Sequence, residues 1–466
     1  MFAGAAFKAT RRMALRAAPR KVGIFFACNF GKTARRRFSP GTDGRHLIFR
    51  ELLRCAVWEK TKGEGMMKPL EGIKVVELTT YFAAPACGRM LADWGAEVIK
   101  VEGPKGDPYR TAYRGQRTPQ FEEGCPSFDL ENSNKSFVCL DTKTEGGREA
   151  VLKLISQCDV FLTNNRLSAL KKMGLTYEEV HARYPKVVYA EVLGYGAKGP
   201  LKDRPGYDYT AFFSRSGLMA DLSSKGGNVM NTVAGFGDHV TAITLASGIC
   251  AALLKAQRTG EGDRVSVALY QAAIFILSNG LLCAEYGREY PRTHFDCNSP
   301  LLTCYRCKDD EWIYLSMPEY DKMWPRICRD IFERPDLAED PRFYCIAETN
   351  KRIGEAVAVC DEIFAEHDSA YWIEKMEAND IAHEKLAHFT DVLKDEQAWA
   401  NGFLQEYTYP RGEKTVFSST PVTFESIGEL PFKHAGRVGE NTRSILRAAG
   451  YAEEDIEALI VSGAAK

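Results

Sequence analysis

Residues 73–101 have the sequence IKVVELTTYFAAPACGRMLADWGAEVIKV, and this stretch decides the fold. Its two ends, Ile73–Leu78 and Val98–Val101, are short apolar segments rich in β-branched residues, and we expect each to form a strand. The residues between them, Ala83–Trp94, have the composition of a helix, which Gly95 is expected to end. Strand, helix and strand in this order predict a βαβ unit with parallel strands.

The same alternation continues along the chain. Further strands are expected at Ser136–Leu140, Val160–Leu162 and Val187–Leu193. Further helices are expected at Gly146–Gln157, Tyr177–Tyr184, His239–Arg258 and around Ser266–Tyr286. Strands that alternate with helices predict an α/β fold, in which a mostly parallel sheet is covered by helices on both faces.

The pattern changes after about residue 290. Ser299–Leu315 predicts two strands joined at Lys308–Asp310, followed by helices at Asp321–Phe332, Lys351–Glu366 and Ser369–Asn379. We expect a smaller α+β domain here, then the helix Asp395–Asn401, more strands, a return toward the first domain near residues 421–424 and a final helix at Glu440–Ala449. The predicted division is a basic N-terminal extension at 1–66, a large domain at 67–290, a small domain at 291–390 and a C-terminal return at 391–466.

Composition limits the function classes. The 466 residues are 45% hydrophobic and 26% charged, with a net charge of -1, which is ordinary for a soluble globular protein and favours neither nucleic acid nor a membrane as partner. No apolar run approaches the ~20 residues that cross a bilayer. The 14 cysteines have no repeating spacing, which indicates a reducing, cytoplasmic location with free thiols.

The first 65 residues differ from the rest. They contain 15 Lys or Arg and 4 Asp or Glu. We expect an over-extended gene start, because the regular pattern begins at Met66-Met67 and Lys62–Gly65 is compatible with translation of a purine-rich ribosome-binding sequence. An Arg-rich transit peptide is the alternative interpretation.

The stretch Asn231–His239, NTVAGFGDH, holds the main catalytic candidate. Asp238 follows Gly235 and Gly237 at a loop-to-helix junction, where little side-chain bulk blocks a substrate carbonyl. A carboxylate there can attack an activated acyl group, and free N–H groups at the helix start can hold an oxyanion. The simpler alternative is that Asp238 only caps the helix.

Other motifs in the sequence give weaker evidence of function. Gly194-Tyr-Gly196-Ala-Lys-Gly199 follows a strand, but Pro200 and Pro205 prevent the helix that dinucleotide binding needs, so we expect a loop at the ligand-binding edge of the sheet. The pair Cys304 and Cys307 has no partner with zinc spacing, and the histidines are dispersed, so no metal site is predicted. His239 does not face Asp238, because helix neighbours point apart.

One set of residues lies at or after predicted strand ends, where a ligand with phosphates is expected to bind. Its members are Lys100, Lys105, Arg110, Asn164, Arg166 and Lys172. Gly237, beside the candidate nucleophile, is also predicted to contact the ligand.

These residues together resemble a known family. The segment Pro69–Leu78, the segment Leu91–Glu102 and Lys255–Asp263 are similar to sequences of the class III (CaiB/BaiF-type) coenzyme A transferases. Further matches, in the same order, are Ala84–Ala86, Asn134–Ser136, Leu140-Asp141, Met173–Leu175 and Gly194–Gly196. Asp238 falls on that family's catalytic aspartate.

The resemblance implies a Rossmann-like large domain, a small domain and an interlocked homodimer. It also implies a CoA transferase that moves CoA between an acyl-CoA and a free carboxylic acid through an aspartyl-CoA thioester on Asp238. Acyl-CoA thioesters are then substrates, and no permanently bound cofactor is expected.

The segments Gly206–Phe213, Glu396–Asn401 and Tyr407–Gly412 look closest to transferases for (R)-2-hydroxy acids, which use 2-enoyl- or cinnamoyl-type CoA donors in amino-acid fermentation, with a dehydratase as a further partner. One alternative is a 2-methylacyl-CoA racemase, but that subgroup has a His where this chain has Tyr207, a poor base near neutrality. The other alternative is a CoA-binding subunit without catalysis.

Overall fold

The computed structural model describes residues 67–428 and 432–466. The predicted N-terminal extension, and both interpretations of it, lie outside the described residues. The well-patterned part that begins at Met66 forms a unit separate from residues 1–65.

A six-stranded sheet forms the centre of the large domain. Its strands are β1 (Lys74–Leu78), β2 (Glu97–Glu102), β3 (Ser136–Cys139), β4 (Val160–Thr163), β5 (Val188–Leu193) and β6 (Arg264–Ala268). Their order is β3-β2-β1-β4-β5-β6, and every neighbouring pair is parallel. In the central register Val75 lies opposite Val98 on one side and Val160 on the other. The predicted parallel α/β sheet is therefore confirmed.

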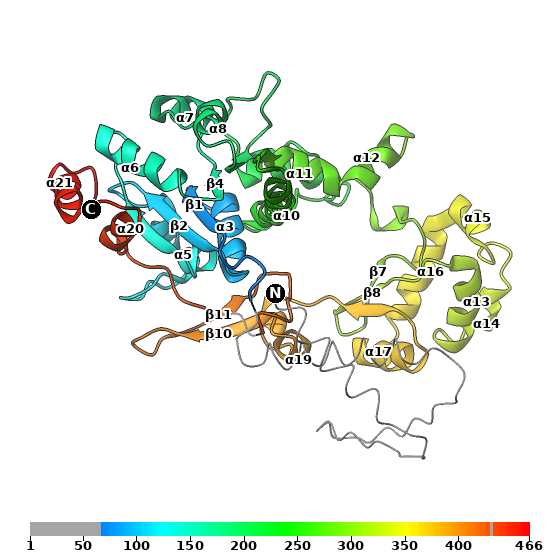
Figure 1. The fold of residues 1–466 in the computed structure, drawn as a ribbon. Helices are drawn as coiled ribbons and strands as arrows, with labels where there is room; N and C mark the ends of the chain where they lie inside the picture. Colours follow the sequence, from blue (N-terminus) through cyan, green and yellow to red (C-terminus); the bar gives the residue numbers. More distant parts are fainter. Residues whose placement is uncertain (1–66, 429–431) are drawn as a thin grey trace, which may run out of the picture. The chain divides into compact units, whose positions relative to one another are not determined.

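Helices cover both faces of this sheet (Figure 1). One layer contains α3 (Ala83–Asp93), α10 (Phe236–Thr259) and α11 (Leu269–Ile276). The other contains α6 (Glu145–Ile155), α7 (Leu167–Met173), α8 (Tyr177–Arg183), α20 (Thr442–Ala448) and α21 (Glu453–Val461). Neighbours in β1 alternate between these layers, since Val75 packs with the first and Val76 with the second.

Two expectations about helices need correction. The helix expected around Ser266–Tyr286 is wrong at its start, because Arg264–Ala268 is the edge strand β6. Helix α11 follows at Leu269 with no loop between them, and a short apolar run of this kind does not distinguish strand from helix by periodicity. The helix expected last, Glu440–Ala449, is shorter (α20) and is followed by α21.

Helix α10 carries the candidate nucleophile and is the longest helix described. By length and composition alone it is apolar enough to cross a membrane, which corrects the expectation that no segment reaches that length. It packs along α3, β5 and β6, and six of its eight buried residues belong to the first core layer. Although only 39% of its most apolar window is buried within the chain, these contacts fix the position of the first turn of α10 next to the sheet.

Short elements fill the connections in this domain. They are η1 (Pro108–Thr111), α4 (Tyr113–Gln116), α5 (Pro126–Asn132), η2 (Asp208–Ser214), α9 (Leu218–Asp221) and α12 (Ser278–Glu285).

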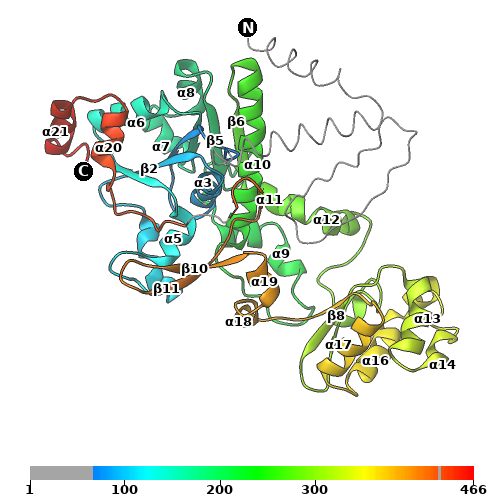
Figure 2. The same ribbon diagram turned by 60° about the horizontal axis from the view of Figure 1, so that its bottom comes forward.

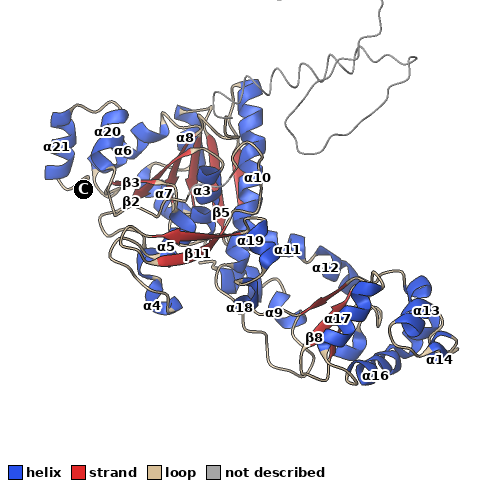
Figure 3. Cartoon of the chain, turned by 90° about the horizontal axis from the view of Figure 1, so that it is seen from below, coloured by secondary structure: helices blue, strands red, loops and turns tan. Residues whose placement is uncertain are grey.

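The small domain has its own core, centred on Trp324, Trp372 and Phe364. Its antiparallel sheet contains β7 (Cys304–Arg306), β8 (Trp312–Leu315) and β9 (His383–Lys385). Its helices are α13 (Tyr320–Asp330), α14 (Pro335–Ala338), α15 (Ile346–Thr349), α16 (Ile353–Phe364) and α17 (Ser369–Ala378), with η3 (His294–Asp296) and η4 (Asn350–Arg352) beside them. Figure 3 shows these strands next to α16 and α17.

The C-terminal segment contacts the large domain. After α18 (Phe389–Val392) and α19 (Glu396–Ala400), strands β10 (Leu404–Thr408) and β11 (Lys414–Ser418) form a hairpin that lies beside α5 (Figure 2). The Arg89 guanidinium donates to the Ser418 carbonyl, and the Tyr409 hydroxyl donates to Asp129 at 2.6 Å. These contacts close the side of the large domain near α3.

Candidate active site

A cleft of about 860 Å³ opens at the carboxyl ends of the central strands. The loops that follow β1, β4 and β5 line it, together with the residues just before α10. The strand order reverses between β1 and β4, and such a switch point is where open α/β sheets bind ligands. The loop at Gly194–Gly199 lies in this cleft and crosses closely over Gly206, where a Cβ on Gly194 would meet the Gly206 Cα at 2.7 Å.

Asp238 lies in the first turn of α10 and lines the cleft. Gly235, with φ 87°, takes the N-cap position, so the simpler interpretation of Asp238 as the cap is wrong. The Asp238 carboxylate has no hydrogen-bond or ion-pair partner among the residues that the structure describes. Burial raises its pKa to about 7, and the negative charges of Asp208 and Glu131 act in the same direction.

Asp208, which belongs to η2, caps the N-terminus of α10. It is buried at the start of η2, and its Oδ2 accepts a hydrogen bond from the Gly235 N–H at 3.0 Å. Burial raises the pKa of Asp208 to about 6, although hydrogen bonding by the backbone amides of Gly235 and Gly237 acts to lower it. The site therefore places two carboxylates with raised pKa values beside one helix N-terminus, an arrangement typical of functional sites.

His239 belongs to a neighbouring pair. Its Nε2 lies 3.0 Å from Glu131 Oε1, and this carboxylate raises the pKa of His239. The imidazole packs edge-on against the Phe82 ring at 5.4 Å between centroids. His239 does not line the cleft, which fits the prediction that it points away from Asp238.

Aromatic side chains surround the approach to Asp238. Tyr81 and Phe82 follow β1, and Tyr109 lies in η1; the Phe82 and Tyr109 rings are 4.9 Å apart between centroids. Tyr207 packs edge-on against Tyr81 at 6.5 Å. We call Tyr81, Phe82, Tyr109 and Tyr207 the aromatic wall. Tyr81, Phe82 and Tyr207 line the cleft and offer apolar surface to a bound molecule, whereas Tyr109 is buried and packs against the Phe82 ring.

The predicted ligand contacts divide into two groups. Asn164 and Arg166 line the cleft. The other charged members do not line it: Lys100 is fully buried in ion pairs, Lys105 and Lys172 are exposed elsewhere, and Arg110 is bound by both oxygens of Glu102.

Gly237 has a packing role. It is buried and does not line the cleft. A Cβ there would lie 2.3 Å from Phe212 Cγ and 2.4 Å from Asp208 Oδ1, so only glycine lets η2 and its carboxylate approach α10.

The structure adds cations that the sequence interpretation missed. They are Lys171, Lys198, Lys202, Arg204 and Arg264. Lys198 lies in the Gly194–Gly199 loop, which the sequence predicts at the ligand-binding edge of the sheet, and Lys202 and Arg204 follow it directly, so this loop was the available signal. Arg264 comes from the edge strand that was mistaken for a helix, and it is paired with Glu191 at 2.8 Å.

Comparison with known proteins gives a consistent result. The sequence profile described as CoA-transferase family III matches residues 70–442. An (R)-2-hydroxy-4-methylpentanoate CoA-transferase of Clostridioides difficile is 42% identical over 83% of this chain and 97% of its own length. A cinnamoyl-CoA:phenyllactate CoA-transferase of Clostridium sporogenes is 38% identical over 83% and 95%. A CaiB/BaiF family protein of Brucella suis has a solved structure with a TM-score of 0.69 and 26% identity, covering 82% of this chain and all of that one.

Proposed function

The chain belongs to CoA-transferase family III and is a CoA transferase, and on that premise we propose that Asp238 is its nucleophile and an (R)-2-hydroxy acid its acceptor. The observation that carries the proposal is the Asp238 carboxylate itself. It faces the cleft from the first turn of α10 without a partner among the described residues, while Gly235 takes the N-cap position and Asp208 accepts the Gly235 N–H.

The reaction proceeds by exchange at this carboxylate. Asp238 attacks the thioester carbonyl of the acyl-CoA, the C–S bond breaks, and a mixed anhydride and the CoA thiolate form. The thiolate attacks the aspartyl carbonyl, which frees the first acid and leaves an aspartyl-CoA thioester. An incoming carboxylate reverses these steps and leaves as the new acyl-CoA. The carboxylate is regenerated, and protons balance at each step.

The helix start supports each step. The amides of the first turn of α10 carry partial positive charge, which stabilises the tetrahedral oxyanions that form at the acyl and aspartyl carbonyls. The small Gly235 beside Asp238 leaves space for the thioester on the cleft side.

The exposed cations at the rim of the cleft bind the CoA phosphates. Lys198 and Lys202 are solvent-exposed on the loop after β5, Arg166 is the N-cap residue of α7, and Lys171 lies in the last turn of α7. Arg166 can hold a phosphate by two parallel hydrogen bonds, whereas the lysines act as point charges. The thioester end of the molecule then extends toward Asp238 and the aromatic wall.

The acceptor class rests on the relatives and on the aromatic wall. Two relatives above 35% identity are named for 2-hydroxy acids with a branched apolar or an aromatic side chain. The aromatic wall beside Asp238 offers the apolar surface that such side chains require.

We also propose a homodimer. The three helices α10, α11 and α12 leave large apolar side chains exposed, and α12 buries none of its residues within the chain. Phe275 is 79% and Tyr286 is 84% exposed. Patches of this kind on a folded protein are typical of a protein interface.

The test is an exchange assay read by mass spectrometry. The chain and Asp238→Ala each meet acetyl-, cinnamoyl-, isocaprenoyl- and succinyl-CoA with (R)-phenyllactate, (R)-2-hydroxyisocaproate, formate or oxalate. We expect new (R)-2-hydroxyacyl-CoA only with the unaltered chain. Hydroxylamine added after the donor alone should mark Asp238 as a hydroxamate. Exchange that persists in Asp238→Ala would remove Asp238 as nucleophile, and exchange only to formate or oxalate would reject the acceptor class.

A further inference from the structure

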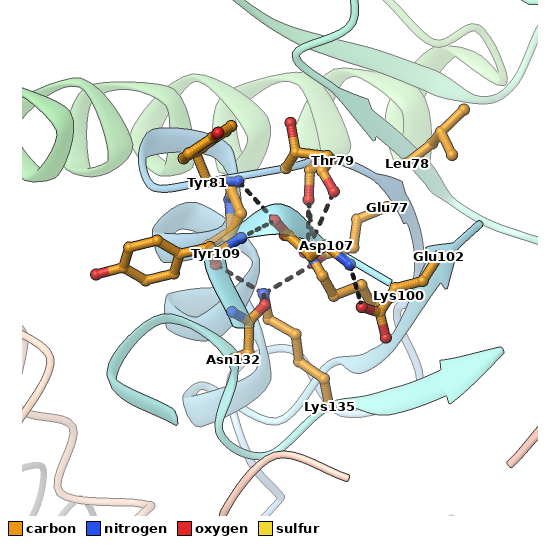
Figure 4. A network of polar contacts seen from close by, with 12 residues as sticks. Glu77, Leu78, Thr79, Tyr81, Lys100, Glu102, Asp107, Tyr109, Asn132 and Lys135 are labelled. Carbon is orange, nitrogen blue, oxygen red and sulfur yellow. Dashed lines mark hydrogen bonds and ion pairs between the residues drawn. The ribbon is translucent and has the colours of Figure 1, made fainter. Parts of the chain in front are cut away.

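The loop after β1, which lines the cleft, is joined to the loop after β2 by a buried ionic network (Figure 4). Lys100 on β2 is fully buried, and its Nζ lies 3.3 Å from Glu77 Oε1 and 3.1 Å from Asp107 Oδ2. The same ammonium donates to the Thr79 hydroxyl and carbonyl at 3.1 and 3.2 Å. Lys135 Nζ lies 2.9 Å from the same Glu77 oxygen. Lys100 thus holds both the loop after β1 and the loop after β2.

Asp107 connects this network to the aromatic wall. Its Oδ1 accepts hydrogen bonds from the Tyr81 N–H at 3.2 Å and the Tyr109 N–H at 2.9 Å. Its own N–H donates to Glu102 Oε1 at 2.8 Å. One carboxylate therefore fixes the backbone of two members of the wall that come from different loops.

The Tyr81 backbone needs such support. Tyr81 has φ 63°, in the left-handed region that a residue with a large side chain rarely adopts. Strain of this kind persists only where the surroundings hold it, and it gathers at functional sites. On the opposite side Asn164 accepts from the Thr80 N–H and donates to the Thr80 carbonyl, which leaves this loop held from two directions.

We propose that the Lys100–Asp107 pair positions Tyr81 and Tyr109, and through them the aromatic wall, so that the enzyme favours acids with a large apolar side chain over small ones. This inference rests on the proposed CoA transfer and gives it a selectivity device. Lys100 and Asp107 are positioning residues, since neither lines the cleft. A fully buried ion pair contributes little net stability, because desolvation offsets most of the attraction between the two charges. The main effect of the network is instead to fix the geometry of the two loops, because Asp107 accepts hydrogen bonds from the Tyr81 and Tyr109 amides.

The test compares two neutralised carboxylates. Asp107→Asn removes the charge facing Lys100 while keeping an oxygen acceptor. Asp93→Asn is the matched control: Asp93 is also buried and paired, with Arg89 at 3.4 Å, but it lies at the far end of α3 from the cleft loops. The readout is the ratio of kcat/KM for (R)-2-hydroxyisocaproate to that for (R)-lactate, with one common CoA donor. Circular dichroism and thermal melting establish that each variant is folded.

We expect Asp107→Asn to lower this ratio by about tenfold, which is the effect of losing a small hydrophobic contact in a specificity pocket. Asp93→Asn should leave the ratio unchanged, whatever it does to the total activity. A purely structural role for Asp107 would reduce the rates with both acids equally and leave the ratio the same. The KM for the CoA donor should stay constant, because the CoA phosphates bind at the other rim.

Two further variants complete the test. Thr79→Val removes one hydroxyl from Lys100 without altering charge, and it replaces Asp107→Asn if that variant does not fold. In Tyr81→Gly, where glycine keeps φ 63° without strain, Asp107→Asn should have little further effect on the ratio. An unchanged ratio in a folded Asp107→Asn or Thr79→Val overturns the proposal. If the unaltered chain transfers CoA to neither acid, the proposed function itself fails, which is seen before any variant is compared.

Discussion

Burial and, after it, the charge on Asp208 should set the pH at which CoA transfer begins. Only the carboxylate form of Asp238 is nucleophilic, and the pKa of Asp238 is raised to about 7. The transfer rate should therefore rise with pH through 7 and level off above it, with about one tenth of the sites ionised at pH 6 and about nine tenths at pH 8. Asp208 is the first charged group that contributes to this rise in pKa.

Asp208→Asn removes that charge with little change in shape. The asparagine Oδ1 still accepts the Gly235 N–H, so the cap on α10 is kept. Like charges in contact raise a carboxyl pKa by about 1 or more, so the pKa of Asp238 should fall by about 1 in the variant. At pH 7 Asp208, with a pKa of about 6, is mostly ionised, so this fall would raise the ionised fraction of Asp238 from about one half to about nine tenths, and we expect the relative rate there to rise by slightly less than about twofold.

The assay is the pH profile of kcat/KM between pH 5 and 9, normalised to its plateau, for the exchange reaction. Asp203→Asn is the matched control, since Asp203 also lines the cleft but is not among the groups that raise the pKa of Asp238. Titration of the CoA 3′-phosphate affects the pH profile of Asp203→Asn in the same way as that of Asp208→Asn, so the comparison removes this effect. A rising limb that is the same in Asp208→Asn, Asp203→Asn and the unaltered chain would refute the reasoning.

Three shorter predictions follow. Asp238→Asn should stabilise the fold by on the order of 2 kcal/mol at pH 8 and by less at pH 5. The pKa of this half-buried carboxyl is raised on folding, so its ionisation opposes folding increasingly as the pH rises from 4 to 7. Chemical denaturation at both pH values measures the stabilisation, and an equal value at both would contradict this prediction. Gly237→Ala should destabilise by about 1–3 kcal/mol, since the new Cβ meets the Phe212 ring; a melting temperature within error of the unaltered chain would count against that packing. The double variant Lys198→Ala and Lys202→Ala should raise the KM for acyl-CoA by about tenfold at constant kcat and weaken its salt dependence, and an unaltered KM would place the phosphates elsewhere.

The sequence predicted the sheet because each of its first five strands is a short, β-branched run separated from the next by a helix or a turn. It missed β6 because the strand Arg264–Ala268 runs directly into an apolar helix, and no turn residue marks the boundary. It located Asp238 for a similar reason: two glycines and a long apolar helix define a junction that is visible without any tertiary contact.

The ligand contacts were harder to predict, because burial of a lysine depends on partners far along the chain. Lys100 has the same local setting as a phosphate-binding lysine after a strand, but Glu77 and Asp107 surround it in the folded protein. Gly237 shows the same limitation, since its function depends on Phe212, which approaches from another element. In contrast, the sequence contains the signal that predicts Lys198 and Lys202 as phosphate contacts, because both follow a strand at the ligand-binding edge of the sheet.

The electrostatics around Asp238 reflect two opposed requirements. A carboxylate with a raised pKa is more basic and therefore a better nucleophile toward a thioester, but it is ionised in fewer molecules at a given pH. Burial, followed by the charges of Asp208 and Glu131, raises the pKa of Asp238, whereas His239 lowers it, and the amides at the start of α10 also favour the charged form. The resulting pKa of about 7 keeps about half of the sites ionised at pH 7 while retaining the added basicity. The Glu131–His239 pair beside the nucleophile therefore adjusts both its reactivity and its ionised fraction, which gives a reason for a histidine that does not line the cleft.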